Sequence, residues 1–247
     1  MAPRNIFLTG ASRGIGAVIA LELARRGYTV GCFSRRGEGP EGLELDAATK
    51  SRLVPLKGDV SEPEAVEAAI NEFVRSAGSL DGIINNAGVH LTTPSETQPL
   101  AEFNEVLLTN ATAVFSVCQK AYPHLVKAGG GMIVNIGSFF DKLGVRHNAA
   151  YCASKAAVAA LSRCLAVEWA SKGIRVVTVA PGYIETDLNK DFLASDRTRA
   201  FLASRIPVGG PANAEEVARL VASLFDVQLS FLTGETIYLD GGQGIAH

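Results

Sequence analysis

The stretch that decides the fold is NIFLTGASRGIG, residues 5–16. Its first five residues form a β-rich run that ends at a glycine, and residues 14–26 then place Ile15, Ile19 and Leu23 on one helical face. A glycine-rich turn between strand and helix lets backbone amides approach a pyrophosphate and permits close helix–strand packing. The spacing is G-x3-G-x-G, and its place between strand and helix argues against a chance cluster among the 25 glycines.

Short apolar runs alternate with longer segments of helical periodicity along the rest of the chain. The expected strands are residues 5–9, 28–33, 53–56, 82–84, 132–136, 175–179 and 236–239. The expected helices are residues 14–26, 63–77, 100–127, 149–172 and 214–225. Apolar runs separated by helices are typical of a parallel sheet covered on both faces. The sequence therefore predicts an α/β fold, a single Rossmann-like doubly wound domain with a seven-stranded parallel sheet.

Length and composition limit the possible architectures. With 247 residues, 47% of them hydrophobic and 19% charged, we expect residues 1–247 to form a single dinucleotide-binding and catalytic domain. A (β/α)8 barrel has a similar length, but it would need eight comparable units and gives no reason for the glycine-rich first turn. The least regular segment is residues 181–213, and we expect a substrate loop or lid at about residues 182–213.

Charge, hydropathy and cysteine spacing argue against several function classes. The formal net charge is −2, without the basic excess of a nucleic-acid-binding protein. No run of about 18 apolar residues occurs, so no membrane span is expected. The four cysteines and four histidines show no metal-ligand spacing, so we expect no metal, reduced thiols, and histidines that are solvated or satisfied in the core. We expect a soluble, cytoplasmic protein.

Two consecutive arginines, Arg35 and Arg36, follow Ser34 at the end of the second expected strand. In dinucleotide-binding folds this position lies beside the adenosine ribose, where a carboxylate would bind a free 2′-hydroxyl. Two guanidinium groups instead bind a 2′-phosphate, and Arg13 in the glycine-rich turn adds a third cation. The alternative is a solvated arginine pair on a surface loop. The location favours NADP(H) over NAD(H) as the cofactor.

Tyr151 and Lys155 lie four residues apart in an expected helix and therefore share one face. A free phenol has a pKa near 10, too high for a group that exchanges protons at neutral pH. An ammonium about 4 Å away, at an effective dielectric constant of about 20, favours the phenolate by roughly 4 kcal/mol before lysine desolvation is subtracted. We therefore expect the tyrosine pKa to fall by at most roughly 3 units. Ser138 ends the fifth expected strand, where its hydroxyl would hold a carbonyl oxygen against Tyr151.

Five motifs, in this order, resemble the short-chain dehydrogenase/reductase family, in the branch that includes 3-oxoacyl-carrier-protein reductases and sugar or polyol dehydrogenases. The motifs are Thr9-Gly10-x3-Gly14-x-Gly16, Asn85-Asn86-Ala87-Gly88, Ser138, Tyr151-Cys152-Ala153-Ser154-Lys155 and Pro181-Gly182. A lone serine or a tyrosine–lysine pair also occurs as surface decoration, but the five motifs together span essentially the whole chain. The resemblance implies an oxidoreductase that moves a hydride between NADP(H) and a ketone or secondary alcohol of a small molecule.

The resemblance also implies roles for individual residues. Ser138 would polarise the carbonyl, Tyr151 would act as general acid and base, and Lys155 would lower the pKa of Tyr151 and bind the nicotinamide ribose. Asn110 would join Lys155 through water in a proton relay. The cofactor would contact Gly10, Ser12, Arg13, Gly14, Ile15, Gly16, Ser34, Arg35, Arg36, Asp59, Val60, Asn86, Ala87, Gly88, Tyr151, Lys155, Pro181, Gly182, Ile184 and Thr186.

A homotetramer is expected as well, because the family commonly pairs the two long helices around Asn110 and Tyr151 between subunits. The apolar faces that would serve such an interface are Val114, Val117, Val158 and Leu161. Core packing within one chain explains these faces equally well.

The substrate stays open at this point. The residues that flank the expected pocket, and that favour an apolar or cyclic ketone, are Phe139, Phe140, Val145, Tyr183 and Leu188. A 3-oxoacyl-carrier-protein reductase of fatty acid synthesis is the alternative, although residues 126–131 offer only one cation for an acidic carrier protein, besides Lys172. An isomerase or lyase resembling the extended relatives would need a longer chain. A non-catalytic NADP-binding sensor would be expected to lack Ser138, Tyr151 or Lys155.

Overall fold

Seven short apolar runs form the central sheet, as their composition predicts for strands covered on both faces. The structure is a computed structural model that describes residues 5–41, 45–186, 195–227 and 229–246. The strands of the sheet are β1 (Asn5–Thr9), β2 (Thr29–Ser34), β3 (Leu53–Lys57), β4 (Gly82–Asn85), β5 (Gly131–Ile136), β6 (Ile174–Pro181) and β9 (Thr236–Leu239). A separate two-stranded sheet pairs β7 (Ile184–Glu185) with β8 (Ala212–Asn213).

The order of the strands decides where a ligand can bind. All pairings in the large sheet are parallel, in the order β3-β2-β1-β4-β5-β6-β9. The direction of winding reverses between β1 and β4, and doubly wound folds form their ligand crevice outside the carboxyl ends of the strands at this point. The predicted fold class, an α/β sheet of seven parallel strands, is confirmed.

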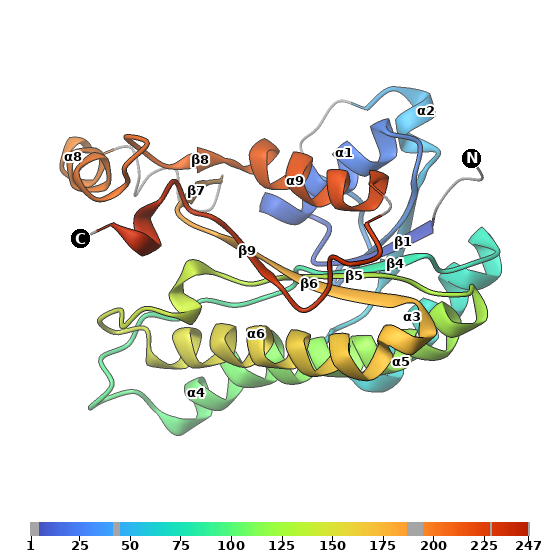
Figure 1. Ribbon diagram of the computed structural model, residues 1–247, viewed down its shortest axis with the longest axis horizontal. Helices are drawn as coiled ribbons and strands as arrows, with labels where there is room; N and C mark the ends of the chain where they lie inside the picture. The colour runs from blue at the N-terminus through green and yellow to red at the C-terminus, as the bar shows by residue number, and fades with distance from the viewer. Residues whose placement is uncertain (1–4, 42–44, 187–194, 228, 247) are drawn as a thin grey trace.

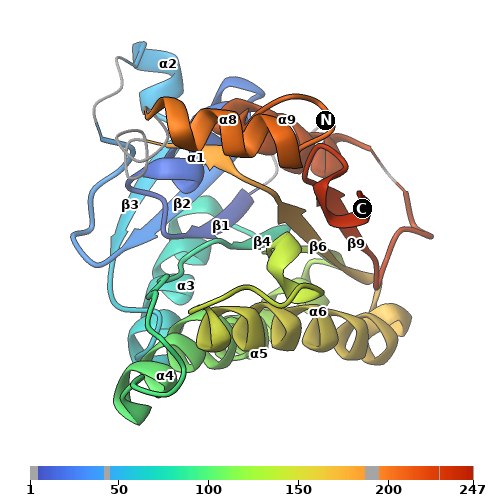
Figure 2. The ribbon, with the colours of Figure 1, turned by 90° about the vertical axis from the view of Figure 1, so that its left-hand side faces the viewer.

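Two layers of helices cover the sheet (Figures 1 and 2). The helices are α1 (Gly14–Arg25), α2 (Ala47–Lys50), α3 (Pro63–Ala77), α4 (Leu100–Leu107), α5 (Ala113–Lys127), α6 (Ala149–Trp169), α8 (Asp196–Arg205) and α9 (Ala214–Asp226). Helices α1 and α9 pack together on one face, and α3, α5 and α6 lie on the other, with α4 beside α6 (Figure 1). Each face has its own apolar core, one around Ile19 and Val217 and the other around Phe73 and Val158.

Two segments differ from the sequence-based expectation. The expected helix 100–127 contains a π-helical turn, Leu108–Thr112, between α4 and α5. The expected loop 182–213 holds β7, α8 and β8 in its described part. Residues 187–194 of that loop lie outside the described residues, so its role as a lid stays a prediction.

Helix α6 and the 3-10 turn after it, Ala149–Lys172, are apolar enough to cross a membrane by length and composition alone, with a mean hydropathy of 1.2. In this fold the helix packs against β6 and α4. Its side chains Lys155, Val158 and Leu165 are buried. The apolar composition of α6 is therefore explained by its place between the sheet and its neighbouring helices.

A buried polar network fixes α6 to three strands. Asn85 Nδ2, at the end of β4, donates to Asn135 Oδ1 of β5 at 2.8 Å. Asn135 Nδ2 donates to Ser162 Oγ of α6 at 2.9 Å, and Thr178 Oγ1 of β6 donates to the same oxygen at 2.8 Å. Because buried polar groups are costly when unpaired, this network favours one position of α6 on the sheet. The position of α6 in turn sets where Tyr151 and Lys155 lie.

Candidate active site

The glycine-rich turn after β1 is bonded to the end of β4. Asn86 Nδ2 donates to the carbonyl oxygens of Thr9 and Gly10 at 3.2 and 3.0 Å. Thr9 Oγ1 accepts the backbone N–H groups of Asn86 and Ala87, both at 3.1 Å. Gly16 lies so close that an added Cβ would be 2.1 Å from the carbonyl oxygen of Gly10. These contacts therefore hold the turn and the residues after β4 together at the point where the winding of the sheet reverses.

The beginning of α1 suits a pyrophosphate. Arg13 is the N-cap residue, and within the described part of the chain no side-chain hydrogen bond caps the helix and no acidic residue stands in its first turn. Gly14 has φ +57°, and a Cβ added there would meet no atom within 4 Å. Open space over unpaired amides, together with the helix dipole, favours a bound anion. The residues at this turn therefore fit a dinucleotide.

Charged side chains of both signs follow the neighbouring strands β2 and β3. Arg35 and Arg36 follow β2 and are exposed, and Asp59 and Val60 follow the neighbouring β3. Hydrogen bonds from Ser61 and the nearby Arg35 guanidinium hold the pKa of Asp59 below its ordinary value. Arg35 and Arg36 follow β2, as the sequence predicted, and the carboxylate of Asp59 lies near Arg35.

Ser138, Tyr151 and Lys155 meet at the carboxyl end of β5. Ser138 lies two residues after the end of that strand and is buried, and it lies close enough to the phenol of Tyr151 to lower the pKa of that group. Lys155 Nζ lies 5.6 Å from the centroid of the Tyr151 ring and donates to the carbonyl oxygen of Ile136 at 2.8 Å. The three side chains that the sequence singled out are therefore brought together.

Burial governs the ionisation of both groups on α6. It raises the pKa of Tyr151 to about 12, against a smaller lowering by the hydrogen bond with Ser138. It lowers the pKa of Lys155 to about 8. The direction for the tyrosine is opposite to the lowering expected from the sequence. The reason is that burial disfavours the charged phenolate more strongly than the contact with Ser138 favours it.

We expect the free energy of unfolding of the wild-type protein, relative to Lys155→Met, to increase as the pH rises from about 8 to 10.5. The folded lysine loses its proton near pH 8, whereas the unfolded lysine keeps it up to about 10.4, so the unfolded state binds more protons in this window. The slope should approach about 1.4 kcal/mol per pH unit. Urea denaturation at several pH values measures it.

The matched control for this experiment is Lys172→Met, since Lys172 is an exposed lysine just after α6. The difference between wild type and this variant should show no such slope. A pH-independent difference between wild type and Lys155→Met would contradict a lysine pKa lowered by burial.

Asn110 lies in the π-helical turn and is buried. Its Oδ1 accepts the N–H of Val89 at 2.8 Å, and its Nδ2 donates to the carbonyl oxygen of Val89 at 2.8 Å and to Ser154 Oγ at 3.1 Å. The side chain therefore ties the segment after β4 to α6 rather than contacting Lys155 directly. Its part in a water-mediated relay stays a prediction.

His90 lies against Tyr151, a contact that the sequence did not predict. Its ring centroid is 4.3 Å from that of Tyr151, at an interplanar angle of 33°. Its Nε2 is 2.5 Å from Oδ1 of the buried Asn148, whose Nδ2 donates to the carbonyl oxygen of Arg146 at 2.7 Å. Since the Asn148 oxygen only accepts, the imidazole carries its proton on Nε2. One feature of the sequence could have indicated this contact. His90 follows β4, and the carboxyl ends of the parallel strands meet at that edge of the sheet.

Aromatic rings line the side of the site next to Tyr151. Phe139 and Phe140 form a 3-10 turn directly after Ser138. The Phe140 ring lies edge-on to Tyr151 at 5.9 Å, and Phe139 lies 5.6 Å from the ring of Tyr183. Leu188, expected in the same pocket, lies outside the described residues. These rings pack together beside Tyr151, with Phe139 and Phe140 buried, and their place in a substrate pocket stays a prediction.

The segment after β6 completes the edge of the site. Pro181 ends β6, and the N–H of Gly182 donates to the carbonyl oxygen of Leu239 at 2.9 Å. A Cβ on Gly182 would lie 2.7 Å from Asp240 Cα, so only glycine passes the end of β9 without displacement. Ile184 in β7 and Thr186 follow at the same edge of the sheet.

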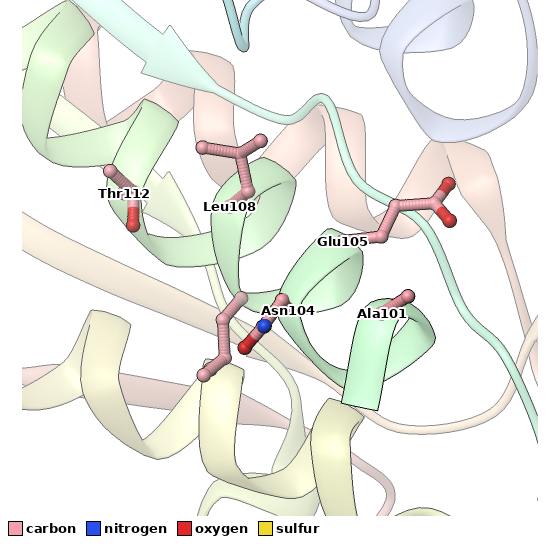
Figure 3. Close-up of a pocket in the computed structure, with 6 residues that line it drawn as sticks. Ala101, Asn104, Glu105, Leu108 and Thr112 are labelled. Carbon is pink, nitrogen blue, oxygen red and sulfur yellow. The ribbon is translucent and has the colours of Figure 1, made fainter. Parts of the chain in front are cut away.

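A hollow of about 610 Å³ on α4 and the π-helical turn is separate from this site (Figure 3). It is lined by Ala101, Asn104, Glu105, Leu107, Leu108 and Thr112. Its lining includes neither Tyr151 nor any residue of the glycine-rich turn, so this hollow is distinct from the candidate active site. On the neighbouring helices, Val114, Val117 and Val158 are buried in the core of this chain, which explains their apolar character without a partner.

Comparison with known proteins assigns the family. The family described as Enoyl-(Acyl carrier protein) reductase matches residues 10–243. A solved short-chain type dehydrogenase/reductase from Mycobacterium marinum has 31% identity and a TM-score of 0.88, over 98% of this chain and 96% of the other. The protein is thus an oxidoreductase that acts on CH–OH or C=O groups with a nicotinamide cofactor. The chain belongs to the short-chain dehydrogenase/reductase family, as its motifs predicted.

Three further relatives have more specific names. The chain is 34% identical to 3beta-hydroxysteroid dehydrogenase 1 of Eggerthella lenta, over 97% of this chain and 93% of that one. It is 35% identical to the 3-oxoacyl-[acyl-carrier-protein] reductase FabG of Staphylococcus aureus, over 97% of each chain. A gluconate 5-dehydrogenase from Burkholderia cenocepacia, solved in complex with NADP and tartrate, is 28% identical with a TM-score of 0.89, over 100% of this chain and 97% of that one.

Proposed function

We propose that the protein is an NADP(H)-dependent oxidoreductase that interconverts a ketone and a secondary alcohol of a small apolar or cyclic molecule, with Tyr151 as general acid and base. The observation that carries the proposal is the meeting of Ser138, Tyr151 and Lys155 beside a glycine-rich turn that fits a pyrophosphate. The Burkholderia relative solved with NADP supports the choice of cofactor.

The proton chemistry follows from the side chains. When bound, the nicotinamide supplies or accepts the hydride. Ser138 and Tyr151 lie beside each other, so their two hydroxyl groups would bind one carbonyl oxygen. In reduction Tyr151 gives its proton to that oxygen, and in oxidation it takes the proton of the alcohol. A pKa raised to about 12 by burial keeps the phenol protonated at neutral pH, which is the state that reduction requires.

Lys155 serves the same proton transfer from the other side of the ring. With a pKa lowered by burial to about 8, the lysine still carries its charge at neutral pH. An ammonium 5.6 Å from the ring centroid favours the negative charge that develops on Tyr151 as its proton leaves. The same ammonium would bind the nicotinamide ribose.

The substrate class follows from the lining of the site. Tyr183 is partly exposed and lies over the buried rings of Phe139 and Phe140, so it offers an apolar surface beside the site. The name of the 3beta-hydroxysteroid dehydrogenase among the relatives agrees with a cyclic substrate. The second candidate is a 3-oxoacyl thioester on a carrier protein, which the FabG relatives favour. Arg146, exposed beside Asn148, is a cation that an acidic carrier protein would contact.

A substrate panel separates these candidates. We expect the purified protein to consume NADPH with cyclic ketones at a higher kcat/KM than with β-keto thioesters or sugars, because aromatic walls bind flat apolar rings. NADPH absorbance under matched conditions measures the rates. Faster turnover of the β-keto thioesters, on a carrier protein or free, would establish the second candidate instead.

We expect Tyr151→Phe to lower turnover by about two to four orders of magnitude, since the phenol is the proton donor. NADPH affinity, measured by fluorescence titration, should stay near the wild-type value because the ring and its packing are kept. Tyr122→Phe is the matched control, since Tyr122 packs on Trp169 within the helical layer. Turnover that is unchanged in Tyr151→Phe would refute the assigned role.

We expect Arg35→Ala with Arg36→Ala to raise the KM for NADPH about tenfold or more and to leave the KM for NADH nearly unchanged. The reason is that only NADPH carries the 2′-phosphate that guanidinium groups bind. Arg75→Ala, an exposed arginine in the last turn of α3, is the control. Equal changes for the two cofactors would remove the argument for phosphate recognition.

The homotetramer and the cytoplasmic location are parts of this proposal. Leu108 and Phe115, next to the hollow on α4, keep 44% and 41% of their surface exposed, which supports a further contact of these helices. Leu161, also on α6, is partly buried. A small-molecule substrate needs no contact with nucleic acid or membrane.

A further inference from the structure

We propose that Glu38 and Glu41 are internal competitors of the cofactor's 2′-phosphate for Arg36, and that they set how strongly the site prefers NADP(H) over NAD(H). This inference rests on the proposed use of NADP(H). Arg36 Nε lies 3.4 Å from Glu38 Oε2, and its terminal nitrogen forms an ion pair with Glu41. The guanidinium that the phosphate would bind is therefore shared by two carboxylates of the loop that follows it.

The backbone of this loop keeps the two carboxylates near Arg36. Ser34 Oγ accepts the N–H of Gly37 at 3.2 Å and donates to the carbonyl oxygen of Glu38 at 3.3 Å. The N–H of Glu41 donates to the carbonyl oxygen of Ser12 in the glycine-rich turn at 3.0 Å. Residues 37–41 thus run from the end of β2 back to the turn, across the adenosine end of the crevice.

The exposure of these side chains decides the size of the effect. Arg36 is 56% exposed, Glu38 59% and Glu41 39%, and exposed ion pairs contribute little to stability. A dianionic phosphate can therefore displace the carboxylates, at a modest loss of affinity. A free 2′-hydroxyl needs no guanidinium, and carboxylates at this position accept hydrogen bonds from such hydroxyls. The glutamates accordingly weaken binding of NADP(H) and leave or improve binding of NAD(H).

The test uses nucleotide fragments that lack the nicotinamide, so that its readout does not depend on catalysis. Adenosine 2′,5′-bisphosphate and 5′-AMP are titrated by calorimetry into wild type and into the double variant Glu38→Gln with Glu41→Gln. We expect the variant to bind the bisphosphate about 3- to 10-fold more tightly, with 5′-AMP unchanged or slightly weaker. Glu235→Gln is the matched control, because this exposed glutamate precedes β9 at the opposite edge of the sheet from β2 and β3.

Arg36→Ala separates competition from simple repulsion. If the glutamates act by occupying Arg36, their replacement should bring no gain for the bisphosphate in the Arg36→Ala background. A gain that persists there would overturn the competition. If Arg36→Ala weakens the bisphosphate but the glutamine variants do not tighten it, the inference fails while the proposed NADP(H) preference stands. If Arg36→Ala leaves the ratio of the two fragments unchanged, the proposed phosphate recognition fails with it.

Discussion

The hydrogen bond from Lys155 Nζ to the carbonyl oxygen of Ile136 joins α6 to the carboxyl end of β5, and the catalytic arrangement depends on it. A lysine that is 5% exposed needs such a partner, because a buried ammonium without hydrogen bonds is strongly unfavourable. The bond places Tyr151, one helical turn earlier, beside Ser138, which follows Ile136 by two residues. The Asn85–Asn135–Ser162 network holds the same helix further along. The buried polar contacts that fix the position of α6 therefore also place Tyr151 and Lys155 for the proposed proton transfer.

Burial at this contact affects the two titrating groups in opposite directions that suit one reaction. It raises the pKa of Tyr151 to about 12 and so keeps a proton available for a carbonyl oxygen. It lowers the pKa of Lys155 to about 8, which leaves the lysine charged at neutral pH but close to releasing its proton. The His90 ring, stacked on the phenol and held by Asn148, covers another side of Tyr151. If Tyr151 is the proton donor that we propose, these protonation states suit reduction.

The sequence predicted the sheet and the motif residues because both leave local signals. Apolar runs of strand length and a glycine-rich turn are visible without any contact being known, and the carboxyl ends of parallel strands must meet at one edge. The π-helical turn Leu108–Thr112 left no such signal, since the apolar periodicity of residues 100–127 runs through it. Helix α8 lies within the expected loop and has a weak apolar pattern, because Leu202 is its only buried residue in the described part of the chain.

Features that depend on depth or on distant contacts were not predictable. The sequence spacing of Tyr151 and Lys155 gave their shared face but not their burial, and burial decides the direction of the tyrosine pKa. His90 is 61 positions from Tyr151, so only the folded sheet edge brings their rings together. The glutamates after Arg36 were visible in the sequence, but their pairing with it follows from the path of residues 37–41 back to Ser12.

The two ends of the crevice therefore differ in how they use charge. At the end that holds Tyr151, Lys155 is buried and hydrogen-bonded, so we expect its removal to change both folding and the proposed proton transfer. At the adenosine end Arg36, Glu38 and Glu41 are all more than a third exposed, so each interaction there is weak and replaceable. These exposed charged residues can therefore be substituted without disturbing the sheet or Tyr151. Under our proposal, single surface substitutions would therefore alter cofactor preference, whereas the proposed proton transfer depends on the core.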